Sequence, residues 1–151
     1  MPHNCYYEIY LHLTWHTKQS VRLLAGDVES RAHKYIVHRI AETPGAFVHQ
    51  IGGTEDHIHI AVSIPPTLLI SKWIGELKGA SAHHLNHNVM DRPVFAWQAG
   101  YGAVTFGQKD LPFVKEYVRN QRARHAEGRI YARLERTDPE EVAEAAVREG
   151  P

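Results

Sequence analysis

Aliphatic and aromatic residues alternate with more polar ones near the start of the chain. Every second residue from Tyr7 to Trp15 is aromatic or aliphatic, and the positions between them carry glutamate, tyrosine, histidine and threonine. Because side chains along a strand alternate between its two faces, this pattern predicts a half-buried strand that reaches His16. Its second face would be rich in aromatic rings and imidazoles, and is therefore not simply a solvated surface.

Apolar residues that recur every three or four positions predict three helices. The first begins at Asp27, the second at Thr67 and the third at Asp110, and each of these residues can cap the amino terminus of its helix. Gly128 lies just beyond the predicted end of the third helix, where glycine is a common terminator.

Apolar runs bounded by glycine and proline predict further strands. Residues 46–51 and 57–64 are two of these strands, with residues 52–53 as the turn between them, and residues 94–97 and 103–106 are short candidates for the last strand. The resulting order is strand, helix, strand, strand, helix, strand, helix. This order predicts an α+β, ferredoxin-like antiparallel sheet with helices on one face and one further helix at the carboxyl end. The second face of the sheet should be free for a partner or a ligand.

Two histidines interrupt the most apolar of these strands. Ile58, Ile60 and Val62 would point to one face, and His57 and His59 to the other. Imidazoles two residues apart on one face stand roughly 7 Å apart, close enough to bind one metal ion above the sheet. A chain with twelve histidines also produces such pairs by chance.

Composition limits the class of protein. With 151 residues, 43% hydrophobic and 23% charged, the chain resembles one soluble globular domain. The single cysteine, Cys5, excludes an internal disulfide and fits a reducing cytosol. We expect no signal peptide and no membrane span, and hence a cytoplasmic protein. A formal net charge of zero counts against a generic nucleic-acid binder. We expect one domain over residues 1–134 and an acidic tail over residues 135–151.

One stripe of the last predicted helix contains several side chains with groups that could take part in catalysis or metal binding. Phe113, Tyr117, Gln121 and His125 are spaced by four, so they lie one above the other. Tyr117 could equally be an amphipathic core residue with its hydroxyl at the rim, and Gln121 a surface amide.

The histidine pair and the stripe of the last helix together resemble the motifs of a known family. His57-Ile-His59 resembles the His-hydrophobic-His (HUH) signature, and Tyr117 followed four residues later by Gln121 resembles the catalytic helix of the single-tyrosine HUH transposases, the small insertion-sequence transposases of the insertion sequence 200 type. The resemblance extends from about Tyr7 to His125. It also includes Leu11-His-Leu-Thr-Trp-His-Thr-Lys18, Gly53-Thr-Glu-Asp-His-Ile-His59, Leu77-Lys-Gly-Ala-Ser81 and Phe95-Ala-Trp-Gln-Ala-Gly-Tyr-Gly-Ala103.

The resemblance implies a homodimer that cleaves and rejoins single-stranded DNA at hairpins, with the active site shared between subunits. Tyr117 would be the nucleophile and would hold the DNA end as a phosphotyrosine ester. His57, His59 and Gln121 would bind a divalent metal, Mg²⁺ or Mn²⁺, that neutralises charge on the scissile phosphate. His125 could be a fourth ligand, a phosphate contact or a cation at the helix end. Asp56 could orient the imidazoles or simply form a turn.

The expected DNA contacts are cationic or imidazole side chains near these elements. They are Lys18, Lys72, Lys78, His83, His84, Arg119, Arg122 and Arg124. The aromatic rings of Tyr10, Trp97 and Tyr101 could stack on unpaired bases or serve only as structural aromatics.

Two other functions fit parts of the pattern. The first is a domesticated relative that binds nucleic-acid hairpins without cutting them, which the neutral charge and the His83-His84 pair favour. The second is a metal-dependent hydrolase in which Tyr117 is only structural, but this hypothesis leaves the tyrosine–glutamine spacing unexplained.

Overall fold

The computed structural model describes residues 4–138. Its centre is an antiparallel sheet of four strands in the spatial order β2-β3-β1-β4. The strands are β1 (Tyr10–His16), β2 (Phe47–Gly53), β3 (His57–Ser63) and β4 (Gly102–Phe106). This is the predicted ferredoxin-like arrangement. The predicted acidic tail lies mostly outside the described residues.

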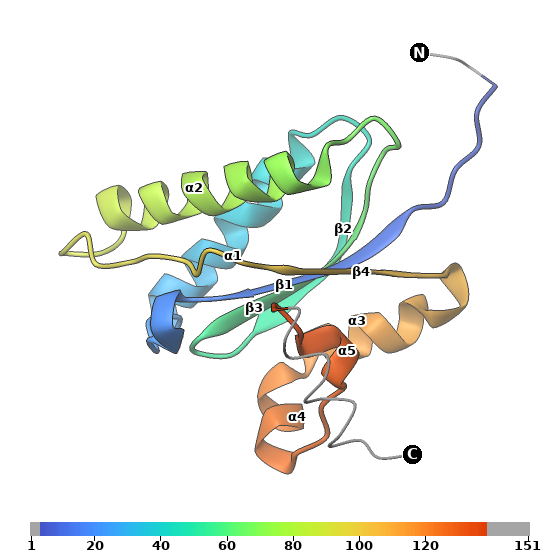
Figure 1. The fold of residues 1–151 in the computed structure, drawn as a ribbon. Coiled ribbons are helices and arrows are strands. Elements are labelled where there is room, and N and C mark those ends of the chain that lie inside the picture. The colour runs from blue at the N-terminus through green and yellow to red at the C-terminus, as the bar shows by residue number, and fades with distance from the viewer. Residues whose placement is uncertain (1–3, 139–151) are drawn as a thin grey trace.

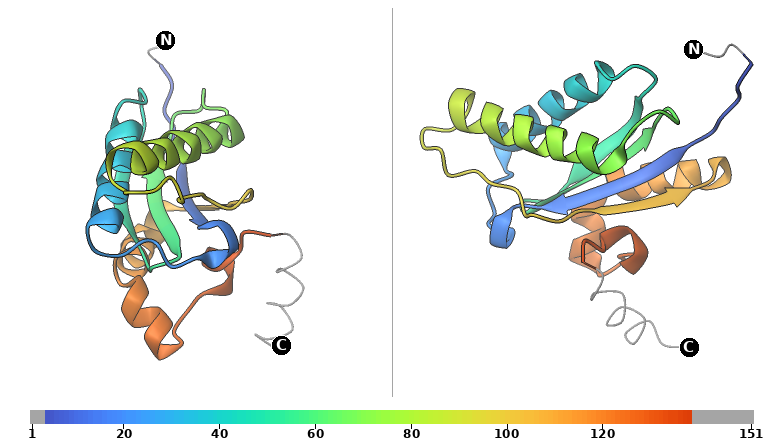
Figure 2. Two further views of the ribbon diagram at one scale, coloured as in Figure 1. Left: turned by 90° about the vertical axis from the view of Figure 1, so that its left-hand side faces the viewer. Right: turned by 45° about the horizontal axis from the view of Figure 1, so that its top comes forward.

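Helices cover both faces of this sheet (Figures 1 and 2). One face carries α1 (Gly26–Ala41) and α2 (Ile70–Asn88). The other carries α3 (Leu111–Arg119), α4 (Gln121–Glu127) and α5 (Ala132–Glu135). Two 3₁₀ turns, η1 (Lys18–Ser20) and η2 (Gln108–Asp110), follow β1 and β4. None of the helices among residues 4–138 has the length and apolar character that crossing a bilayer requires.

The main core lies between the sheet and the α1–α2 layer. Leu13, Trp15, Ile58 and Ile60 point into it from the two central strands, and each is 0% exposed. The register pairs Leu13 with Ile60 and Trp15 with Ile58, so the apolar positions of both strands face the same side. The predicted period of two is therefore confirmed in the central strands.

The prediction that the second face is free was wrong. Val114 and Val118 of α3 pack on Ala61 of β3 in a smaller apolar cluster. The close approach depends on Gly52 in β2, where a Cβ atom would lie only 2.1 Å from the carbonyl oxygen of Val118. Residues 52–53 are the end of β2, not a turn. The lack of a side chain at Gly52 allows α3 to lie against the sheet, whereas a Cβ atom on Gly53 would meet the His57 carbonyl oxygen of β3.

Several local predictions also differ from the structure. α1 begins at Gly26 and α2 at Ile70, and neither Asp27 nor Thr67 is the N-cap residue. Asp110 does precede α3, but without a side-chain cap. The predicted strand over residues 94–97 is reduced to one isolated bridge at Trp97. The predicted long last helix is interrupted at residue 120, where the backbone leaves the helical region.

Candidate active site

Two histidines project from β3 onto the face of the sheet opposite α1 and α2. Ile58 and Ile60, their neighbours along the strand, are buried in the main core. Strand alternation therefore fixes His57 and His59 on the other face, as predicted. The two side chains are 3% and 0% exposed, and their ring centroids are 5.0 Å apart.

The Nδ1 atom of each of these imidazoles contacts a neighbouring side chain. Nδ1 of His57 lies 2.6 Å from Oδ1 of Asp56 and 2.9 Å from Oγ1 of Thr54. Nδ1 of His59 lies 2.7 Å from Nε2 of His12 on β1. Such contacts fix the orientation of metal-binding imidazoles. They leave the Nε2 atoms of both histidines available for a common ligand.

Burial favours the neutral form of His12 and His59, whereas the hydrogen bond with Glu135 raises the pKa of His125. Burial, and then the charge of His59, puts the pKa of His12 well below its usual value. Burial also lowers the pKa of His59. Burial alone would raise the pKa of Asp56, but the hydrogen bond and charge of His57 hold it below its usual value. Neutral imidazole is the form that binds metals.

Gln121 reaches the histidine pair from the helical layer above. Its Nε2 donates to the backbone carbonyl of Tyr117 at 3.0 Å, which turns its Oε1 toward the imidazoles. That oxygen lies 3.3 Å from Nε2 of His57 and 3.0 Å from Nε2 of His125. The backbone break at Asn120 lies between Tyr117 and Gln121, and Gln121 is nevertheless buried against the sheet.

Glu135, at the end of α5, is the site residue that the sequence did not predict. Its Oε1 lies 3.1 Å from Nε2 of His125, 3.4 Å from Nε2 of His59 and 3.5 Å from Nε2 of His57. Its Oε2 accepts a hydrogen bond from the hydroxyl of Tyr117. Burial would raise the pKa of Glu135, but its contacts with the His125 and His59 side chains hold it well below its usual value.

These donors form a set that could hold a metal ion. One ligand atom from each of His57, His59, His125 and Glu135 lies within 4.8 Å of all the others. Neighbouring ligands around a tetrahedral ion with bonds of about 2.1 Å are roughly 3.4 Å apart, close to the contacts of the carboxylate described above. Nε2 of His59 is buried without a hydrogen-bond partner, and a bound cation would satisfy it. The donor set therefore fits a divalent metal.

Tyr117 lies beside this cluster, and its side chain is 0% exposed. The centroid of its ring is 5.9 Å from that of His59. Its hydroxyl accepts a hydrogen bond from the backbone N–H of Tyr131 at 3.0 Å and donates to Glu135. Burial, and then the charge and hydrogen bond of Glu135, raises the pKa of the Tyr117 phenol well above its usual value.

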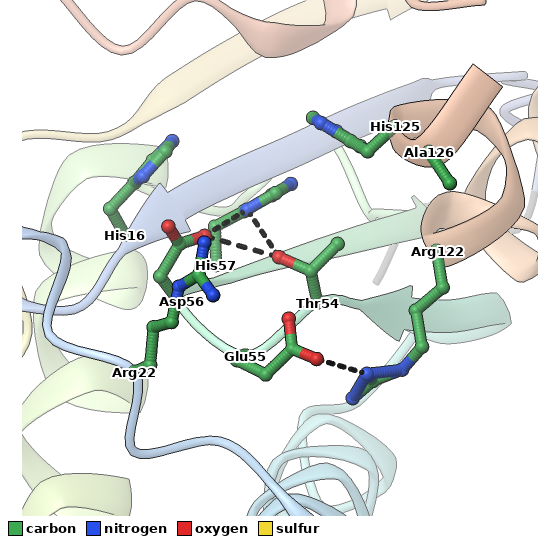
Figure 3. Close-up of a pocket in the computed structure, with 9 residues that line it drawn as sticks. All are labelled: His16, Arg22, Thr54, Glu55, Asp56, His57, Arg122, His125 and Ala126. Carbon is green, nitrogen blue, oxygen red and sulfur yellow. Dashed lines mark hydrogen bonds and ion pairs between the residues drawn. The ribbon is translucent and has the colours of Figure 1, made fainter. Parts of the chain in front are cut away.

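An open cavity of about 540 Å³ leads to the histidine pair (Figure 3). Arg22 and Arg122 approach it from opposite sides, and His57 and His125 line its inner part. The Arg122 guanidinium contacts Glu29 at 2.6 Å and Glu55 at 3.0 Å. The cavity thus joins the imidazole cluster to two cationic side chains, of which Arg22 was not predicted from the sequence.

Comparison with known proteins identifies the family. The family model described as "Transposase IS200 like" matches residues 5–121. This chain belongs to the IS200-like transposase family. The matched range contains His57, His59, Tyr117 and Gln121 and ends before His125 and Glu135. The predicted resemblance is thereby confirmed.

Characterised relatives agree with this assignment. The ISDra2 transposase TnpA of Deinococcus radiodurans is 26% identical over 120 residues, which cover 76% of this chain and 85% of the relative. The transposase of insertion sequence element IS200 from Salmonella typhimurium is 28% identical over 123 residues, covering 78% of this chain and 77% of the relative. The chain therefore spans most of the length of these transposases.

Solved structures support the fold. A crystal structure of a Deinococcus radiodurans R1 protein described as a transposase superposes with a TM-score of 0.61 at 22% identity, covering 80% of this chain and 96% of that one. A REP-associated tyrosine transposase bound to a REP hairpin gives a TM-score of 0.59 at 14% identity, covering 86% and 76%. At these identities the likeness concerns the fold alone.

The residues of this IS200-like transposase predicted to contact DNA fall into two groups. Those on α2 lie across the sheet from the histidine pair. Lys72 and His83 are exposed there, and the His84 ring stacks on Tyr35 with centroids 4.2 Å apart. The Lys78 ammonium donates to the carbonyls of residues 98, 99 and 100, at 2.6, 3.3 and 2.8 Å.

The second group lies nearer the site. Lys18 and Arg119 are exposed, and Arg122 lines the cavity. Arg124 is only 9% exposed. Its guanidinium pairs with Glu116 at 2.6 Å and lies 5.1 Å from the centroid of the Tyr117 ring. Arg124 therefore packs against the aromatic rings around Tyr117 in this structure and is not exposed for DNA contact.

Proposed function

We propose that this IS200-like transposase cleaves and rejoins single-stranded DNA at hairpin-marked ends through a covalent bond between the DNA and Tyr117. One observation carries the proposal. The phenol of Tyr117, the amide of Gln121 and the imidazoles of His57 and His59 meet in one cluster, although residues 57–59 and 117–121 are far apart in the sequence.

The chemistry needs both parts of this cluster. The Tyr117 oxygen forms a bond to phosphorus while the bond from phosphorus to the leaving deoxyribose oxygen breaks. The phenol loses its proton to water and the leaving oxygen takes one from water, so the step is balanced and can run in reverse to rejoin the strand. A phenol with an ordinary pKa of about 10 is a weak nucleophile at neutral pH, so the reaction needs electrostatic help.

His57, His59 and Gln121 would hold the divalent metal, with His125 as a further donor. When bound, the ion would polarise the scissile phosphate and neutralise charge on its oxygens. Mg²⁺ and Mn²⁺ are the proposed ions, although imidazole ligands give later transition metals higher raw affinity. Asp56 would orient His57 through its Nδ1 atom.

The DNA would approach through the open cavity. Arg122 lines it, and Lys18 and Arg119 are exposed. These three side chains are our candidates for phosphate contacts, which would make binding weaken with salt. We propose single-stranded hairpin DNA as the partner. The solved complex of the REP-associated tyrosine transposase with a REP hairpin supports this choice.

Tyr117→Phe tests the nucleophile. The assay incubates single-stranded hairpin DNA and Mn²⁺ with the protein and detects the covalent adduct on a denaturing gel. Wild type should form the adduct and Tyr117→Phe should not. Tyr131→Phe is the matched control, because that ring packs on Tyr117 but contributes only its backbone N–H to the phenol. An adduct with Tyr117→Phe would refute the assignment.

The same assay separates the alternatives. Hairpin binding without cleavage in any divalent metal would indicate a domesticated hairpin-binding protein, which the buried, doubly hydrogen-bonded Tyr117 hydroxyl favours. Cleavage that survives Tyr117→Phe but is lost in His57→Ala would indicate a metal-dependent hydrolase.

We also propose that the protein is a homodimer with a shared active site. Since α3 packs on β2 and β3 of its own chain, sharing would require α3 and α4 to pass to the partner's sheet. Mixing Tyr117→Phe with His57→Ala protein tests this. Recovery of adduct formation in the mixture supports a shared site, and its absence, with dimers present, supports a site within one chain.

A further inference from the structure

The carboxylate of Glu135 joins the two halves of the site. We propose that Glu135 is a metal ligand in the DNA-free transposase and that the scissile phosphate replaces it when DNA binds. This inference rests on the proposed function. Glu135 lies outside the range matched by the family model, which ends at residue 121, so family membership does not assign it this role.

The contacts of one carboxylate oxygen support ligation. Oε1 of Glu135 lies near the Nε2 atoms of all three histidines, His57, His59 and His125, at 3.1–3.5 Å. The side chain is 15% exposed, so the charge is largely removed from water. A buried carboxylate among three imidazoles is stabilised if a cation is shared among them.

The contacts of the other oxygen support exchange. Oε2 accepts the hydrogen bond of the Tyr117 hydroxyl, so a single carboxylate touches both the donor cluster and the nucleophile. A scissile phosphate must meet the same two requirements, with an oxygen at the metal and its phosphorus within reach of the phenol. Both groups are anionic oxygen donors, and they cannot occupy this position together.

The state of Tyr117 agrees with exchange. With Glu135 in place the phenol is 0% exposed and its hydroxyl is hydrogen-bonded twice. The Glu135 carboxylate also places a negative charge directly against this hydroxyl. Departure of Glu135 would remove this charge and open one side of the phenol.

The segment that carries Glu135 is short enough to move as a unit. α5 has four residues, and a helix this short is not stable without tertiary contacts. Its anchors include Leu134, which is 4% exposed, the hydrogen bond from the Arg133 guanidinium to the Thr105 carbonyl of β4, and the passage of the Arg136 backbone beside Gly102. A Cβ atom on Gly102 would lie 1.9 Å from the Arg136 carbonyl oxygen.

Metal binding without DNA tests the ligand role. Mn²⁺ affinity is measured by calorimetry, and Co²⁺ ligation by its visible absorption bands. Glu135→Gln should weaken Mn²⁺ binding about tenfold or more and change the Co²⁺ bands. Glu127→Gln, which affects only an exposed pair with Arg129, should leave both unchanged. Circular dichroism confirms that each variant is folded.

Two outcomes separate this inference from the proposed function. Unchanged Mn²⁺ affinity and Co²⁺ bands in Glu135→Gln, with binding lost in His57→Ala, would overturn the role of Glu135 alone. Unchanged binding in His57→Ala as well would overturn the metal site and with it the proposed function.

Adduct formation as a function of DNA concentration tests the exchange. At saturating Mn²⁺, Glu135→Gln should reach half-maximal adduct at a lower DNA concentration than wild type. Gly102→Ala should shift the curve in the same direction, because it displaces the segment while keeping the carboxylate. Loss of the adduct at every DNA concentration in folded Glu135→Gln would overturn exchange, since Glu135 would then be required for the reaction itself.

Discussion

The two faces of the sheet are held by different forces. On the α1–α2 face, side chains from β1 and β3 such as Leu13, Trp15 and Ile60 are apolar and fully buried. On the α3–α5 face, the same strands present His12, Thr14 and the histidine pair, and the Gln121 and Glu135 side chains of the layer above contact this pair, in addition to the small apolar cluster around Ala61. One strand, β3, therefore contributes to both a hydrophobic core and a reactive surface.

This difference between the faces would let the site hold its histidines in fixed positions and still exchange Glu135 for the scissile phosphate, as proposed. The positions of the histidines follow from close packing on the opposite face, because a strand cannot shift by one residue without burying its imidazoles in the core. Tyr117 and Glu135 are joined to each other and to the histidines by polar contacts in addition to packing, and equivalent contacts from a ligand can replace polar contacts. A fixed histidine half and an adjustable half around Tyr117 would suit the proposed strand cleavage and rejoining.

The largest effect should come from two neighbouring residues of β3 that face opposite ways. Ile60→Ala should reduce the free energy of unfolding by about 2–5 kcal/mol, because Ile60 is 0% exposed in the core, while the folded protein still binds Mn²⁺. His59→Gln should abolish tight Mn²⁺ binding. Urea unfolding and calorimetry measure the two quantities. Loss of metal binding in folded Ile60→Ala would contradict the separation of the two faces.

A smaller change in the free energy of unfolding is expected from substitutions at two glycines, Gly52 in β2 and Gly79 in α2. Gly52→Ala forces α3 away from the sheet, since the new Cβ would lie 2.1 Å from the Val118 carbonyl oxygen, and should cost about 1–3 kcal/mol. Gly79 of α2 has open space around the corresponding position, so Gly79→Ala should stabilise the helix by up to about 1 kcal/mol. Equal effects in thermal unfolding would show that α3 is not held closely against β2.

The placement of His57, His59, Tyr117 and Gln121 could be predicted from the sequence because it follows from local patterns. The alternation around His57 and His59 determines the face on which they lie, and spacing by four determines that Tyr117 and Gln121 share a side of their helical segment. These rules hold wherever the chain carries the pattern.

The rest of the site depends on contacts that no local pattern encodes. Glu135 follows a connection without periodicity, and only the packing of Leu134 and the space beside Gly102 bring it to the histidines. Composition instead suggested that Glu135 begins an acidic tail. His12 was recognised as part of an unusual strand face, but its contact with His59 follows from the β1–β3 register. The predicted caps at Asp27 and Thr67 were wrong, because α1 already begins at Gly26 and α2 begins only at Ile70.

The smallest expected effect is a loss of stability on acidification that arises from His33, which lies between the helices of the two faces of the sheet. It lines a cavity together with Gly52 of β2 and Arg122 of α4, and its Nε2 is buried without a hydrogen-bond partner. Burial, and then the charge of Arg122, lowers the pKa of His33 to about 4. The unfolded chain would therefore bind a proton near pH 6.5 that the folded protein does not bind until about pH 4.

The difference in proton binding between the folded and unfolded chain determines how stability changes with pH. Stability should be complete above about pH 6.5 and should decrease as the pH falls toward 4, because protons then favour the unfolded chain. The loss between pH 7 and pH 5 should be about 2 kcal/mol or less. Urea unfolding at several pH values measures it, and His33→Gln should flatten the profile by that amount. An unchanged profile in His33→Gln would mean that the acid sensitivity arises from the imidazoles of the active-site face, and that the meeting point of the two faces contributes nothing to it.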